Sequence, residues 1–124
     1  MKVIKKVALA FIKDKKLLMV RSHKNKDIFY NLGGKFEEGE SDIECLMREV
    51  KEEVNVKLDS NSLEFLHEFR TAAHGKEDAE LIIRLYAGNL LQEPKPSSEI
   101  AEIGYFDSSV DEQKVTKMGK QILL

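Results

Sequence analysis

A glycine, an arginine and four glutamates stand at spacings that suit metal-dependent chemistry on phosphate groups. The positions are Gly34, Glu40, Arg48, Glu49, Glu52 and Glu53. Carboxylate oxygens are the protein ligands that Mg2+ prefers, and Mg2+ usually also binds waters and substrate phosphates. This segment therefore indicates a divalent cation site beside a pocket for a phosphorylated molecule.

A helix is predicted to carry these glutamates. Ser41 followed by Glu44 forms a capping box, which marks a helix start. Apolar residues recur at helical spacing in one stripe, at Ile43, Leu46, Met47, Val50 and Val54. At about 100° per residue, the last three glutamates of the pattern share one side of the helix, away from the stripe.

A run of charge on a helix is most often only a solvated face. Two features argue against that interpretation here. Like charges at these spacings destabilise an isolated helix by about 0.2–0.5 kcal/mol per pair. Glutamates near a helix C-terminus also oppose the helix dipole. A bound divalent cation would relieve both effects, so we favour a metal site.

The segment GKFEEGESDIECLMREVKEEVNV, residues 34–56, resembles the Nudix box, G-x5-E-x7-R-E-U-x-E-E-x-G-U with U aliphatic. Asn55 stands where the box has Gly. That residue follows the helix and is expected in the left-handed region, where Asn is the next best residue after Gly. Leu32 stands where the family usually has Pro, which affects the stiffness of the loop and not the chemistry.

The resemblance implies an α/β fold, the Nudix α/β/α sandwich with a mixed central sheet, in one domain spanning residues 1–124. It implies a pyrophosphohydrolase that uses Mg2+ (or Mn2+). Water would attack phosphorus in a nucleoside diphosphate linked to another moiety, as in a nucleoside triphosphate or a nucleotide sugar. A non-catalytic sensor of the same fold and a diphosphate isomerase are the alternatives. Degenerate modules usually lose the box glutamates, and the chain is short for the isomerase.

The same resemblance assigns roles to single residues. Glu52 and Glu53 would bind the metal, Glu49 would bind it or support a ligand, and Arg48 would orient a glutamate. The predicted catalytic residues are Arg48, Glu49, Glu52, Glu53 and Glu99. The predicted metal site is Glu49, Glu52, Glu53 and Gly34, and the predicted substrate-binding residues are Arg21, Gly33, Gly34 and Glu40.

Three of these residues lie outside the box: Arg21, Glu99 and Gly33, which directly precedes it. Residues 1–26 carry nine Lys or Arg against Asp14, and Arg21 is the choice to attract phosphate, although most such cations only solubilise the surface. Glu99 is the candidate general base because related enzymes take an acidic residue from the corresponding loop. The competing candidates are Glu77, Asp78 and Glu80, and a plain surface carboxylate is an equal alternative for each.

The composition bounds the class of protein. A chain of 124 residues, 42% hydrophobic and 34% charged, can bury one core. The single cysteine, Cys45, and an apolar run of only six residues, Val7 to Ile12, favour a cytoplasmic protein. A net charge of -2 does not favour a nucleic acid polymer or a membrane as partner. We expect a small-molecule substrate and a monomer or homodimer.

The remaining elements follow from apolar alternation. Strands are predicted over Lys2–Ile12, Lys16–Ser22, Leu63–Thr71, Leu81–Leu90 and Ala101–Phe106. A turn is expected at Lys13–Lys15 and a C-terminal helix over Val110–Leu124. Phe29 and Tyr30 could stack on a nucleobase or belong to the core.

Overall fold

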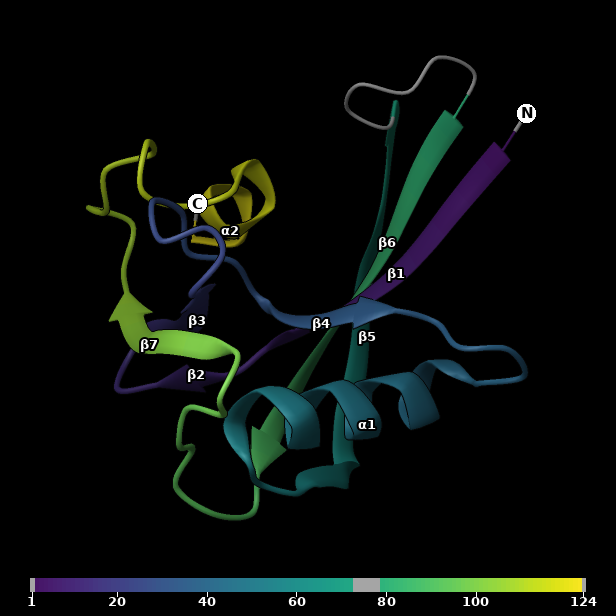
Figure 1. The fold of residues 1–124 in the computed structure, drawn as a ribbon, viewed down its shortest axis with the longest axis horizontal. Helices are drawn as coiled ribbons and strands as arrows, with labels where there is room; N and C mark the ends of the chain where they lie inside the picture. The colour runs from purple at the N-terminus through teal and green to yellow at the C-terminus, as the bar shows by residue number, and fades with distance from the viewer. Residues whose placement is uncertain (1, 73–78, 124) are drawn as a thin grey trace.

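The structure, a computed structural model, describes residues 2–72 and 79–123 (Figure 1). Its elements are β1 (Lys2–Ala10), β2 (Ile12–Lys13), β3 (Lys16–Ser22), β4 (Leu32–Lys35), α1 (Asp42–Val54), β5 (Leu58–Ala72), β6 (Ala79–Leu90), β7 (Ile100–Phe106) and α2 (Lys117–Leu123). One sheet has the order β4-β1-β6-β5 and the other β2-β3-β7. The first sheet is mixed, because β1 pairs with β6 in parallel and with β4 antiparallel.

Both faces of the strands are covered. Successive side chains of a strand point to opposite faces, and β1 uses both. Val7 and Leu9 join the core cluster that contains Leu46, Val50 and Val54 of α1. Ala8 and Ala10 join the cluster against which Met118 and Ile122 of α2 pack. The predicted α/β/α sandwich is therefore confirmed, with the helices on opposite faces.

The caps of α1 are as predicted. Ser41 Oγ accepts a hydrogen bond from Glu44 N at 3.2 Å, and Glu44 Oε1 accepts one from Ser41 N at 3.0 Å. At the other end Asn55 has φ 58° and ψ 25°, the left-handed region, and its N–H donates to Lys51 O at 3.1 Å. The helix that carries the glutamates is thus fixed at both ends by local contacts.

The predicted apolar stripe of α1 is wrong at its first member. Ile43 is 43% exposed, whereas Cys45 is completely buried. The reason is the position of β4, which lies over the Cys45 side of the first turn. Cys45 Sγ donates to Lys35 O at 3.5 Å, so a thiol faces the strand where the periodicity placed an isoleucine.

Several element boundaries also differ from the prediction. The strand expected over Lys2–Ile12 breaks at Phe11, where the chain passes from one sheet to the other. Gly33 and Gly34 lie in strand β4, because that segment pairs with β1. β5 begins at Leu58, and a shift in its register with β6 between Asp59 and Glu64 hides its alternation. The turn before β3 is confirmed, since both of its central residues have positive φ.

The C-terminal helix is shorter than expected. It begins at Lys117 and not at Val110. Two aspartates upstream of the helix each accept a hydrogen bond from a backbone N–H two residues later in the chain. Asp107 accepts from Ser109 N, and Asp111 accepts from Gln113 N. Such contacts favour turns over helix.

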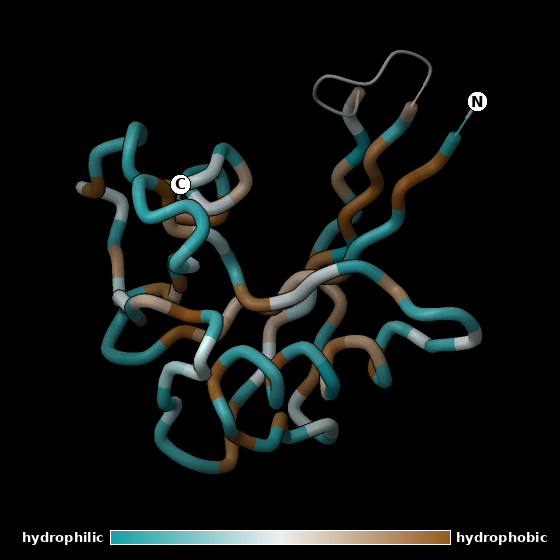
Figure 2. Tube along the Cα trace, in the orientation of Figure 1, coloured by the Kyte–Doolittle hydropathy of each residue, from teal (hydrophilic) through white to brown (hydrophobic). Residues whose placement is uncertain are grey.

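Figure 2 shows the hydrophobic residues along the strands and the hydrophilic ones in the loop that leads into α1. Among the described residues, no helix is long and apolar enough to span a membrane.

Candidate active site

Two glycines in β4 allow the strand to approach both its neighbour and the helix. Gly33 has φ 137°, and a Cβ there would lie 2.0 Å from Val7 O of β1. A Cβ at Gly34 would lie 2.6 Å from the carboxyl carbon of Glu49 on α1. A larger residue at Gly33 would collide with the backbone of β1, and one at Gly34 would displace the Glu49 carboxylate.

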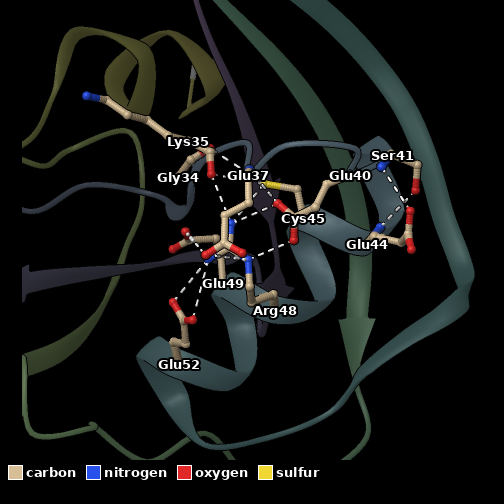
Figure 3. A network of polar contacts seen from close by, with 10 residues as sticks. All are labelled: Gly34, Lys35, Glu37, Glu40, Ser41, Glu44, Cys45, Arg48, Glu49 and Glu52. Atoms are coloured by element: carbon tan, nitrogen blue, oxygen red, sulfur yellow. Dashed lines mark hydrogen bonds and ion pairs between the residues drawn. The ribbon is translucent and has the colours of Figure 1, made fainter.

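Arg48 is the centre of the polar network on α1 (Figure 3). Its Nε and Nη2 donate to the two carboxylate oxygens of Glu40 at 2.7 and 2.9 Å. Its Nη1 donates to Glu49 Oε1 at 2.9 Å and lies 3.3 Å from Glu52 Oε2. Nη2 also donates to Lys35 O at 3.0 Å. Arg48 therefore contacts the glutamates and the end of β4 together, as an orienting residue would.

Glu40 is a structural partner in this network. Besides Arg48, it accepts a hydrogen bond from the N–H of Glu37 at 2.8 Å. The bonds from Arg48, and then the one from Glu37, lower the pKa of Glu40 to about 2. Glu40 therefore ties the loop before α1 to the helix. Its carboxylate, expected to be substrate-binding, is already engaged by the protein.

Glu53 lies in a different environment from Glu52. Its Oε1 accepts a hydrogen bond from Gly33 N at 3.0 Å. Burial raises the pKa of Glu53 to about 8, and the neighbouring charges of Glu49 and Glu52 add to the shift. Burial also raises the pKa of Glu49. Charged carboxylates in such positions are stabilised by a nearby cation, so this environment favours one.

The glutamates meet at one pocket of about 320 Å3. The residues that line it are Ser22, His23, Lys24, Tyr30, Glu49, Glu52, Glu53, Ser98, Glu99 and Ile100. The structure thus brings Glu99 to the three box glutamates. Its loop is held against α1, where Ser97 N donates to Glu53 O at 3.0 Å, and against the end of β3, where His23 N donates to Glu99 O at 3.2 Å.

Arg21 does not line this pocket in the described part of the chain. Its Nη2 forms an ion pair with Glu102 at 2.6 Å, and its Nη1 donates to Lys26 O at 2.9 Å. His23 and Lys24, just after β3, line the pocket instead, and sequence analysis did not select them. The sequence contained little indication of this role, because both are polar residues in a predicted loop. Only the fold brings that loop toward α1.

The other candidate bases lie elsewhere. Glu80 is at the start of β6 and forms an ion pair with Arg70 at 3.2 Å. Glu77 and Asp78 fall outside the described residues. Cys45 is fully buried, and its burial raises the pKa of the thiol to about 12, so the thiol is protonated at neutral pH and does not serve as a nucleophile.

The donor set fits a hard divalent cation shared with a ligand. Within residues 2–72 and 79–123, no three His, Cys, Asp or Glu side chains form a ready-made metal cluster. Mg2+ is usually bound by one or two carboxylates together with waters and substrate phosphates, and not by a protein cage. Three glutamates around an open pocket, two of them with raised pKa values, match that requirement.

The described residues combine an α/β/α sandwich with a pocket lined by glutamates. The NUDIX domain profile matches residues 4–117, and this match defines the class of protein as a hydrolase of the pyrophosphohydrolase type. The chain therefore belongs to the Nudix hydrolase family. No curated protein matches it in sequence.

Solved structures of Nudix proteins share the fold. The MutT NUDIX hydrolase from Burkholderia pseudomallei superposes with a TM-score of 0.81 at 17% identity, covering 99% of this chain and 97% of that one. The NUDIX hydrolase from Nitrosomonas europaea gives 0.71 at 21% identity, covering 98% and 80%. A UDP-X diphosphatase gives 0.79 at 23% identity, covering 99% of this chain and 62% of its own. At these identities, the likeness concerns the fold alone.

Proposed function

We propose that this protein is a Mg2+-dependent (or Mn2+-dependent) pyrophosphohydrolase. Its substrate would be a nucleoside diphosphate linked to another moiety, as in a nucleoside triphosphate or a nucleotide sugar. The observation that carries the proposal is the convergence of Glu49, Glu52, Glu53 and Glu99 on one pocket. Carboxylates alone would repel a diphosphate, so the pocket needs a cation to accept one.

In this proposal Glu52 and Glu53 hold the divalent cation, with Glu49 as a further ligand or as their support. The cation would neutralise charge on the diphosphate and lower the pKa of a bound water. Arg48 positions Glu49 and Glu52 through its Nη1 contacts. Lys24 is the only Lys or Arg among the described residues of the pocket, and it is the group placed to pair with a phosphate oxygen.

Glu99 is proposed to take the proton of the attacking water. Its side chain is exposed at the pocket, and its loop is fixed to α1 on one side and to the end of β3 on the other. A general base needs such a restrained position within reach of the water. The other candidate function, a non-catalytic nucleotide sensor, has no specific support, since every box glutamate is present at the pocket or in its network.

The direct test is hydrolysis of a nucleotide library with Mg2+, read as release of phosphate or pyrophosphate. Glu52→Gln and Glu53→Gln should each lower kcat at least about a hundredfold with intact folding, because the lost charge acts in the transition state. Glu38→Gln, an exposed glutamate before α1, is the matched control and should keep wild-type turnover. Near wild-type turnover in both test variants would remove the carboxylates from the mechanism.

A further inference from the structure

One edge of the mixed sheet is open along its longest strand. β5 has 15 residues and is the last strand in the order β4-β1-β6-β5, and among the described residues no strand pairs with its outer side. Its first part is covered, because Leu58 and Leu63 pack in the core cluster that contains residues of α1. Its other end extends with β6 and β1 beyond both helices (Figure 1). The unpaired backbone groups of an edge strand are a template for pairing with another chain.

The last part of this edge lacks the features that usually prevent such pairing. Edge strands are commonly protected by Lys, Pro or a β-bulge. The register of β5 with β6 shifts between Phe65 and His67, and from there to Ala72 it is unbroken. Residues 67–72, HEFRTA, contain neither Lys nor Pro. Leu66, just before this segment, is 47% exposed. A regular, open ladder of backbone groups therefore lies beside an exposed apolar side chain.

The charges of this segment complement those of a second copy. Glu68 lies opposite Arg84 of β6 and pairs with it at 2.8 Å, and Arg84 also pairs with Asp42 of α1. Glu68 is therefore on the α1 face of the sheet, and so is Arg70, whose Nη2 lies 2.8 Å from Glu68 Oε2. When two copies of β5 run antiparallel with Phe69 opposite Phe69, each Glu68 lies opposite Arg70 of the other copy. The charges then alternate in sign both along and across the strands, which favours pairing.

The neighbouring registers are less favourable. Directly opposite residues in a symmetric antiparallel pair lie on the same face of the sheet, so the symmetry axis passes through a single residue position. An axis at Glu68 places two glutamates opposite each other, and an axis at Arg70 places two arginines opposite each other. Like charges in such positions are destabilising. An axis at His67 brings the irregular part of β5 into the ladder. Phe69 is the remaining centre.

We propose that this protein forms a homodimer in which β5 pairs antiparallel with β5 of a second copy, in the register centred on Phe69. The two mixed sheets then form one continuous sheet, and the interface is isologous, the usual form for a homodimer. The segment is short, so the dimer should be weak and its population should depend on concentration. The inference is independent of the proposed function, because no residue of the segment lines the glutamate pocket.

Engineered cysteines test the register directly. Opposite residues of antiparallel strands have Cα atoms about 4.5–5.5 Å apart, a separation that a disulfide can bridge. His67 lies opposite Thr71 of the second copy, so the variant with both His67→Cys and Thr71→Cys should form a covalent dimer on mild oxidation, seen on a non-reducing gel. Cys45, the native cysteine, is completely buried and should not contribute.

The two single variants are the matched controls. In each of them the two copies of the new cysteine would be offset along the strands by about 13–14 Å, which is too far for a disulfide. His67→Cys alone and Thr71→Cys alone should therefore stay monomeric on the gel, whereas an equimolar mixture of them should cross-link. No covalent dimer in the double variant, or equal cross-linking in a single variant, would overturn the proposal.

Sedimentation equilibrium over a series of concentrations tests the pairing without a cross-link. Arg70→Glu places a glutamate opposite Glu68 of the second copy and should raise the dissociation constant of the dimer at least about tenfold. Lys95→Glu, at an exposed lysine after β6, makes the same change in net charge and should leave that constant as in the wild type. Thermal melts establish that both variants fold. A wild type that stays monomeric throughout the series, or equal dissociation constants in wild type and Arg70→Glu, would refute the dimer.

Discussion

The carboxylate of Glu49 stands in the space that a side chain at residue 34 would occupy. A Cβ on Gly34 would lie 2.6 Å from the Glu49 carboxyl carbon and 2.7 Å from each of its oxygens. The glycine at the start of the motif and the glutamate on α1 therefore form one unit, although a loop and two turns of helix separate them in sequence. The strand must lack a side chain for the carboxylate to lie over it.

Gly34→Ala should therefore displace Glu49 and lower kcat at least about tenfold. The change in Tm should be small, because the displaced group is the end of a flexible side chain. Kinetics and thermal melts of Gly34→Ala, Glu49→Ala and the double variant test this contact. In the Glu49→Ala background, alanine at residue 34 should add almost nothing to the loss of activity. Independent, additive losses would show that Gly34 acts by another route.

The raised pKa of Glu53 predicts an unusual pH dependence of stability in the metal-free protein. Glu53 titrates near 8 in the folded state and near its ordinary value of 4.5 when unfolded. Between those values the folded state holds one more proton, so its stability should fall as pH rises from about 4.5 to 8. Denaturant melts in EDTA measure this, and Glu53→Gln should flatten the decline. An equally steep decline in that variant would assign the effect to another group.

The left-handed conformation of Asn55 predicts which substitutions the end of α1 tolerates. Asn55→Gly should change stability by less than about 1 kcal/mol, because both residues accept positive φ. Asn55→Val should be more destabilising, since a β-branched residue is poorly accommodated there. Unfolding in urea compares the variants, and a valine variant as stable as the wild type would contradict the cap assignment.

Glu99 is expected to contribute to water activation and Glu77 is not. Glu99→Gln should reduce kcat by about 10²–10⁴-fold, the range typical of a general base, and leave metal affinity nearly intact. The comparison with Glu77→Gln is made at saturating Mg2+ on the best substrate found. A large loss in the Glu77 variant alone would reverse the assignment. No loss in either would mean that the α1 glutamates or a metal hydroxide activate the water unaided.

Local sequence determined the helix that carries the site. The capping box at Ser41 and the left-handed Asn55 concern contacts within a few residues, and both were predicted correctly. The clustering of Glu49, Glu52 and Glu53 on one pocket also followed, because helical geometry fixes their relative directions. The resemblance of residues 34–56 to the Nudix box added the fold and the class of reaction.

Tertiary structure decided what no local pattern contains. The sequence cannot show that β4 lies over Cys45 and leaves Ile43 exposed, or that Glu102 engages Arg21 while Lys24 lines the pocket. It also did not show that Glu53 is buried enough to raise its pKa, or that the Asn31 amide is buried with no hydrogen-bond partner among the described residues. Burial, ion pairing and unmet hydrogen bonds depend on which distant segments meet, and strand pairing decides that over separations far longer than a helical turn.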